Sequence, residues 1–254
     1  MTYKEKVNAY RQLVCDVQNC AKLNDCNKSS SKKAVELEKC PFCYEINLWS
    51  YWHGGVNNLD ADILLVGQDW GNYHDKKCSD LIEQIKLHSK ESERRFSYPT
   101  KQSTTDQNLC SLFDMLGKEY NIRNSNNHKV FFTNFVLCYR KSGSITGGFR
   151  QQWARNCSEH FKRLVEIIQP KIIICLGKQV YTAVMKCAGE IPKRQGYNLT
   201  IADGARQVSF SSATSIVFPM AHCGALGTRN RNKNTSCTKL TLQESDWTKI
   251  NEYF

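Results

Sequence analysis

The sequence predicts an α/β protein in which a central, mainly parallel sheet is covered by helices on both faces. Short apolar runs recur within the segments 63–66, 130–134 and 171–176, which is typical of buried parallel strands. Two of these runs stop at glycine, Gly67 and Gly177. Segments with helical spacing of apolar residues alternate with the runs, as in βαβ units.

The elements follow from these patterns in order along the chain. Helices are predicted at residues 3–19, 79–88, 107–120, 158–169, 178–187 and 243–253, and strands at 63–66, 130–134, 171–176 and 216–219. Residues 199–201 and 208–210 are predicted to form a hairpin around Asp203-Gly204. Polar composition predicts loops at 24–33 and 228–239. No repeat or boundary divides the chain, so we expect a single domain over 1–254, with residues 1–60 forming an N-terminal helix and a Cys-rich segment packed on it.

Composition favours a polyanionic partner. The chain has 254 residues and a formal charge of +11, from 35 Lys and Arg against 24 Asp and Glu, which favours nucleic acid over a membrane surface. No apolar stretch reaches the ~18 residues of a membrane helix, and the N-terminus lacks an apolar signal core. We therefore expect a cytoplasmic protein without membrane contact, and a monomer.

Thirteen cysteines require an explanation in a cytoplasmic protein, where disulfides are disfavoured. Cys110, Cys175 and Cys187 lie in apolar patterns and are expected to be packing residues. The candidates for metal or cluster ligation are Cys15, Cys20, Cys26, Cys40, Cys43, Cys138 and Cys157. Among them, the turn from Cys40 to Cys43 could present two thiolates to zinc or to an iron–sulfur cluster.

Three polar residues follow predicted strands at their carboxyl ends: Asp69, Asn134 and His222. Each alone could be a cap, a turn residue or a hydrogen-bonded histidine. Ligands of open α/β sheets bind at this edge, and three such residues at one edge favour a shared site.

Several motifs, in order, resemble those of the uracil-DNA glycosylase superfamily. They are Gly67-Gln68-Asp69, Phe96-Ser97-Tyr98-Pro99, Thr133-Asn134-Phe135-Val136-Leu137-Cys138, Cys157, the segment 169–177 and Phe218-Pro219-Met220-Ala221-His222. The resemblance covers roughly residues 40–226 and is strongest to the iron–sulfur branches. It implies a three-layer α/β/α sandwich with a four-stranded sheet.

The same resemblance implies a four-iron cluster held by Cys40, Cys43, Cys138 and Cys157, in a structural role without a redox step. Cys43 lies 24 positions before Gly67, which matches those branches. However, the family pair normally follows the N-terminal helix directly, where this chain has Cys20 and Cys26. Either could replace one ligand. Alternatively, a separate zinc site could be formed by Cys20, Cys26, Cys40 and Cys43.

Roles of the site residues also follow from the resemblance. Asp69 and His222 are the implied catalytic residues: Asp69 orients water and favours the cationic sugar, and His222 stabilises the departing base anion. The base would be bound by Gln68, Gly71, Phe96 and Asn134. DNA would be contacted by Leu226, Arg229, Arg231 and Lys233, although a solvated surface loop explains this basic segment equally well.

The expected activity is that of a monofunctional DNA glycosylase acting on single- or double-stranded DNA. Gly71 replaces a tyrosine that blocks C5 substituents in the best-known branch, so the base is uracil or a C5-modified pyrimidine. The iron–sulfur branches share this glycine and accept uracil. The role is base-excision repair or defence against modified phage DNA; the alternative is a non-catalytic DNA-binding or damage-sensing module with the same fold.

Overall fold

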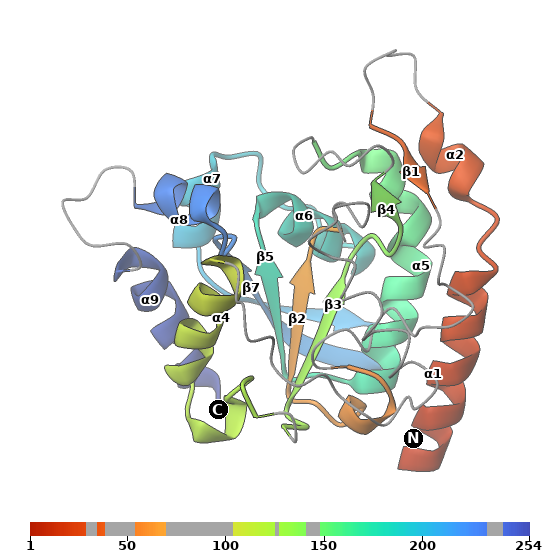
Figure 1. Ribbon diagram of the computed structural model, residues 1–254, viewed down its shortest axis with the longest axis horizontal. Coiled ribbons are helices and arrows are strands. Elements are labelled where there is room, and N and C mark those ends of the chain that lie inside the picture. The colour runs from red at the N-terminus through yellow and green to blue at the C-terminus, as the bar shows by residue number, and fades with distance from the viewer. Residues whose placement is uncertain (29–34, 39–53, 70–103, 125–126, 141–147, 233–240) are drawn as a thin grey trace.

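The computed structural model describes residues 1–28, 35–38, 54–69, 104–124, 127–140, 148–232 and 241–254, shown in colour in Figure 1. The helices are α1 (Tyr3–Gln18), α2 (Leu23–Asn27), α4 (Thr104–Asp114), α5 (Gln151–Ile168), α6 (Lys178–Cys187), α7 (Tyr197–Ala202), α8 (Ala225–Arg231) and α9 (Thr241–Thr248). Short 3-10 turns occupy Val56–Asn58, Lys118–Tyr120 and Lys249–Tyr253. The strands are β1 (Leu37–Glu38), β2 (Ile63–Gly67), β3 (Val130–Asn134), β4 (Tyr139–Arg140), β5 (Ile172–Leu176), β6 (Arg206–Phe210) and β7 (Ala213–Met220).

The central sheet has five strands in the order β3-β2-β5-β7-β6. The first four are parallel, and β6 pairs with β7 in the antiparallel sense. The chain leaves β2 to one side to form β3 and then crosses to the other side to form β5. This reversal places a topological switch point beside β2, where α/β proteins bind ligands outside the carboxyl ends of their strands.

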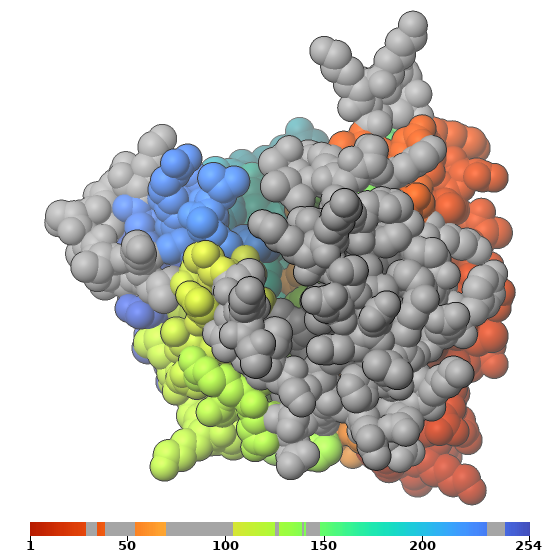
Figure 2. All heavy atoms as spheres, in the orientation of Figure 1, coloured from red at the N-terminus to blue at the C-terminus, as the bar shows by residue number. Residues whose placement is uncertain are grey.

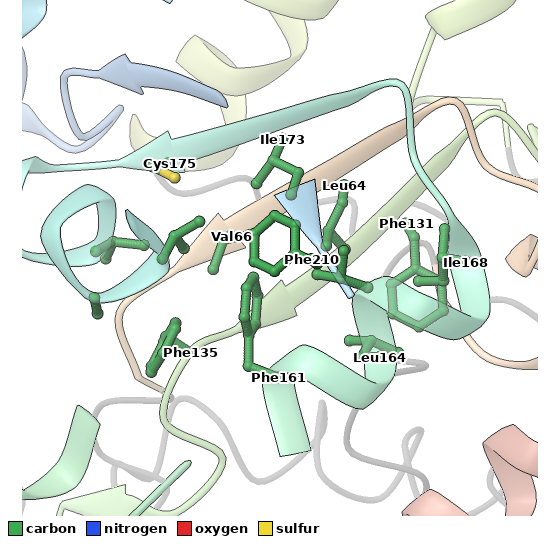
Figure 3. Packing of buried hydrophobic residues seen from close by; sticks show 14 of the residues in the cluster. Leu64, Val66, Phe131, Phe135, Phe161, Leu164, Ile168, Ile173, Cys175 and Phe210 are labelled. Carbon is green, nitrogen blue, oxygen red and sulfur yellow. The ribbon is translucent and has the colours of Figure 1, made fainter. Parts of the chain in front are cut away.

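Helices cover both faces, which confirms the predicted α/β sandwich. On one face, α1, α5 and α6 pack over alternate strand residues in the cluster that includes Leu64, Phe131, Phe161 and Ile173 (Figure 3). On the other face, α4 and α9 pack over the remaining residues of the same strands, with Trp247 fully buried. The core therefore has two apolar layers, one on each face of the sheet, and the arrows of β2, β3 and β5 point toward the same edge (Figure 1).

Several predicted elements are wrong in detail. The sheet has five strands because Arg206–Phe210 adds an antiparallel edge strand. Residues 199–201 lie in α7, so the hairpin turns between β6 and β7 at Ser211, which has φ 25°, and not at Asp203-Gly204. Three residues are too few to separate strand alternation from helical spacing.

Two predicted loops contain helix, and three predicted helices have different bounds. α2 occupies part of the predicted loop 24–33, and α8 includes the first residues of the predicted basic loop. α4 begins at Thr104 and ends at Asp114, six residues before the predicted end. α5 begins at Gln151, well before the predicted start, and the C-terminal helix is α9 followed by a 3-10 turn. The predicted helix at 79–88 lies outside the described residues. None of the described helices combines the length and the apolar character needed to cross a membrane.

Candidate active site at the carboxyl edge of the sheet

The register between β2 and β3 brings Asn134 beside the residues that follow β2. Gly67 pairs with Asn134 in the parallel ladder. Two backbone hydrogen bonds extend the ladder: Phe135 N donates to Gly67 O at 2.9 Å, and Val136 N donates to Gln68 O at 3.0 Å. A Cβ atom on Gly67 would lie less than 3.0 Å from Asn134 Oδ1, a separation that real Cβ atoms do not show. Glycine is therefore needed here for the close approach of the Asn134 amide. The residue Asn134 is 6% exposed.

Asp69 lies just beyond β2 and is held in a buried ion pair. Arg140 Nη2 donates to Asp69 Oδ2 at 2.7 Å, and Arg140 Nε donates to Oδ1 at 3.0 Å. The Gln68 amide also donates to Oδ2, at 2.9 Å. The Asp69 and Arg140 side chains are only 6% and 4% exposed, so the carboxylate has a fixed orientation in a dry environment.

His222 follows β7 on a turn that fixes its ring. The backbone N–H of Gly224 donates to His222 Nδ1 at 2.9 Å, so in the neutral ring the proton is carried by Nε2. Although His222 has exposed surface, the protein around it removes enough water to lower its pKa, while the nearby negative charge of Asp69 acts to raise that pKa. The site therefore contains a neutral imidazole with one N–H donor near a carboxylate.

The backbone of this turn is anchored by three side chains that the sequence did not single out. The Tyr197 hydroxyl of α7 accepts a hydrogen bond from His222 N at 3.2 Å. The buried Gln243 amide donates to His222 O at 3.2 Å, and Asn108 of α4 donates to Cys223 O at 2.7 Å. In Figure 2 the blue surface of α8 lies beside the yellow surface of α4, where these elements meet. No local pattern signals these contacts, because each partner is distant in sequence.

The predicted DNA-contacting residues separate into two groups. Leu226 of α8 is 62% exposed, and Arg229 is also exposed. By contrast, Arg231 forms a two-point ion pair with the buried Asp246 of α9, with Nε–Oδ2 and Nη2–Oδ1 distances of 2.7 and 2.9 Å. The structure thus gives Arg231 a partner within the protein. Lys233 lies outside the described residues, as do Gly71 and Phe96.

Four cysteines gather where α2, α5 and the end of β3 meet. Burial raises the pKa of Cys157, and the neighbouring Cys138, Cys26 and Cys20 raise it further. Asn156 Nδ2 lies 3.2 Å from Cys26 Sγ, which joins α5 to α2. Cys40 and Cys43, which were predicted as ligands, lie outside the described residues.

This cysteine cluster (Cys20, Cys26, Cys138 and Cys157) offers thiol donors of the type that bind zinc or iron–sulfur groups, and of the four only Cys26 is buried while the others are half-buried. Among the described residues, no three His, Cys, Asp or Glu side chains stand close enough together to form a ready metal site. Even so, the raised pKa values of Cys26 and Cys157 favour their neutral thiols, and a bound metal would stabilise their thiolates. Of the predicted packing cysteines, Cys110 and Cys175 are fully buried, whereas Cys187 is half-buried.

Comparison with known proteins gives one family match. The model of the uracil DNA glycosylase superfamily matches residues 54–245, which include Asp69, Asn134 and His222. No curated protein matches the chain. Members of the superfamily act on DNA as glycosylases, so the match supports a DNA glycosylase in general. Because the match covers well over half of the chain, the protein belongs to the uracil DNA glycosylase superfamily.

Proposed function

We propose that this protein is a monofunctional DNA glycosylase that flips a uracil or a C5-modified pyrimidine out of DNA and hydrolyses its N-glycosidic bond. The observation that carries the proposal is the convergence of a carboxylate, an amide and a neutral imidazole at the switch point of the sheet. Base excision needs a group that recognises the base, a group that stabilises its anion and a group that favours the cationic sugar.

Base recognition is assigned to Asn134. Its amide carries both donors and an acceptor, so it can pair with the polar edge of a pyrimidine. Its close approach to Gly67 limits the positions available to the amide. Such fixed polar groups let a pocket select among flipped bases.

Bond cleavage is assigned to His222 and Asp69. When the bond between the base nitrogen and C1′ breaks, the electron pair leaves with the base and positive charge develops on the sugar. The N–H at His222 Nε2 would donate to a base oxygen that gains negative charge, and the lowered pKa of His222 keeps the ring neutral. Asp69 would stabilise the sugar cation and orient the water that adds to C1′. The proton that this water loses passes through solvent and neutralises the released base anion.

DNA contacts are assigned to α8. Arg229 is an exposed cation, and Leu226 is an exposed apolar side chain that could fill the space left by a flipped base. The net charge of +11 supports contact with a phosphate backbone. We expect the protein to act as a monomer in the cytoplasm, in repair or in defence against modified phage DNA.

An iron–sulfur cluster is part of the proposal. It would order the segments around the cysteine cluster without entering the reaction. The proximity of Cys20 and Cys26 to Cys138 and Cys157 supports these four as ligands, with Cys40 and Cys43 as the competing pair. Iron and zinc analysis of Cys26→Ser and Cys40→Ser separates the two sets, because loss of a true ligand should lower the iron content. Zinc without iron would contradict the cluster.

The test of activity is base release from oligonucleotides that carry uracil, hydroxymethyluracil, hydroxymethylcytosine, glucosylated hydroxymethylcytosine, hypoxanthine or thymine. Strand cleavage at the resulting abasic site reports excision. Asp69→Asn and His222→Ala should abolish excision while DNA binding remains. The matched controls, Asp114→Asn and His128→Ala, change exposed residues elsewhere and should behave as wild type.

The panel also identifies the substrate and the role. Release of uracil alone would indicate repair. Release of a bulky C5-modified base, with uracil ignored, would indicate action on foreign DNA. No release from any substrate would contradict the glycosylase proposal and favour a DNA-binding module.

A further inference from the structure

The ion pair between Asp69 and Arg140 is a feature of the site that neither the motifs nor the general reaction require. Both side chains are almost fully buried, and the guanidinium contacts both carboxylate oxygens. Burying two charges carries a desolvation cost that their attraction does not always recover, so such a pair is weak evidence of a stabilising role. Its position beside a candidate catalytic carboxylate indicates a functional role.

Arg140 is held in place independently of Asp69. It lies on β4, where it pairs with Leu37 of β1. Its guanidinium carbon lies 5.9 Å from the centre of the Trp153 ring, and Trp153 is fully buried. The Trp153 indole N–H donates to Cys26 O at 3.0 Å, so the ring is fixed against the α2 segment. The guanidinium is thus a rigid support for the carboxylate.

Asp69 is the member of the pair whose charge acts on His222. The negative charge of Asp69 reaches His222 and acts on its pKa. An ion pair is also a dipole, so a sugar bound on the carboxylate side experiences its negative end. A carboxylate that is preoriented in this way needs no rearrangement as positive charge develops on the sugar.

We propose that Arg140 is a positioning residue for excision: its two-point contact holds Asp69 in the orientation that acts on the sugar, and Trp153 and β1 hold Arg140. This role rests on the proposed glycosylase function. A direct phosphate contact is the competing role for an arginine, but the Arg140 side chain is only 4% exposed. By comparison, Arg229 is exposed and suits phosphate contact.

The test separates turnover from binding. Arg140→Ala should lower kcat about 100-fold, since displacing a catalytic group by about 1 Å costs that much, and KM should stay within about 3-fold. Added guanidinium at low millimolar concentration should restore part of the lost kcat of Arg140→Ala. Arg140→Lys keeps the charge without the two-point contact, so its kcat should fall about 10-fold.

Two arginine variants serve as controls. Arg163→Ala removes an ion pair with Asp16 elsewhere and should leave kcat and KM unchanged. Arg229→Ala should raise KM with little effect on kcat. If Arg140→Ala fails to fold, the kcat of Arg140→Lys tests the role, and thermal unfolding checks that this variant is folded.

Different results would overturn different parts of the reasoning. Wild-type kcat in Arg140→Lys and Arg140→Ala would refute the positioning role alone. A raised KM with unchanged kcat in Arg140→Ala would identify Arg140 as a phosphate contact and would also refute the positioning role. A wild-type protein that releases no base from any oligonucleotide would refute the proposed function, and this role with it.

Discussion

Replacement of Gly67 by alanine tests the contact that positions Asn134. The new Cβ would lie less than 3.0 Å from Asn134 Oδ1, 3.4 Å from Asn134 Cγ and 3.7 Å from Phe132 Cε2. Of these neighbours, only the Asn134 side chain is too close. We therefore expect Gly67→Ala to displace the amide and to leave the rest of the strand in place.

The magnitude follows from two opposing effects. Alanine is better than glycine within a strand by about 0.5–1 kcal/mol, whereas forcing extra volume into a packed site costs about 1–3 kcal/mol. The wild-type background should therefore show a net loss of stability. In an Asn134→Ala background the clash is absent, so Gly67→Ala should stabilise the protein. The coupling free energy between the two substitutions should therefore be about 1–3 kcal/mol.

The assay combines unfolding with excision. Urea unfolding of the four proteins of this cycle gives the coupling free energy, and single-turnover base release gives the effect on the reaction. Gly67→Ala should slow release about 100-fold, because the amide that reads the base has moved. Gly148→Ala is the control, since no heavy atom lies within 4 Å of its added Cβ.

Two results would refute this reasoning. Additive effects of Gly67→Ala and Asn134→Ala on unfolding would mean that the contact does not constrain the amide. Wild-type excision by a destabilised Gly67→Ala protein would mean that Asn134 does not read the base.

The remaining predictions concern His222 and α8. Gly227→Ala would place a Cβ 2.8 Å from His222 Cβ and 2.9 Å from its carbonyl carbon, so excision should fall as in His222→Ala; wild-type rates would contradict this. NMR titration should give His222 a pKa below the ordinary histidine value of ~6.5. The pKa of His222 should be lower still in Asp69→Asn, because the Asp69 carboxylate acts to raise it. An unchanged or higher pKa in Asp69→Asn would be inconsistent with a charge interaction between the two side chains. Asp246→Asn should lower the free energy of unfolding by about 3 kcal/mol, because it leaves the Arg231 charge poorly paired. Urea unfolding measures this change, and an unchanged stability would mean that the ion pair does not stabilise the protein.

The parallel strands were predictable from local sequence. β2 and β5 are fully buried and β3 and β7 are mostly buried, so their apolar runs can be recognised in the sequence without knowledge of the neighbouring strands. The edge strand β6 was mispaired in the prediction because only two of its residues, Val208 and Phe210, are buried. The second half of α8, from Thr228, was predicted as part of a loop because its polar residues give no apolar period. The contact of α8 with α9, from Arg231 to Asp246, has no signal in the local sequence.

The site was predictable only where residues occupy strand ends. Asp69 lies two residues after Gly67 at the end of β2, and Asn134 ends β3, whose parallel register places it beside Gly67. Arg140 and Tyr197 were missed because their roles depend on contacts with residues 71 and 25 positions away, respectively. The sequence can therefore predict which residues lie at strand ends, but it cannot predict which residues from distant segments contact and support them.

The N-terminal segment has a consequence for how the protein could be shortened. The family match begins at residue 54, yet Tyr10 and Leu13 of α1 belong to the same apolar cluster as β2 and β3. Lys6 Nζ, on a buried side chain, donates to Leu59 O at 3.1 Å and to Ile168 O at 3.2 Å, so the start of α1 is bonded to the chain beside β2 and to the end of α5. A fragment cut to the family boundaries would expose that apolar surface to water. We therefore expect such a fragment to aggregate on expression.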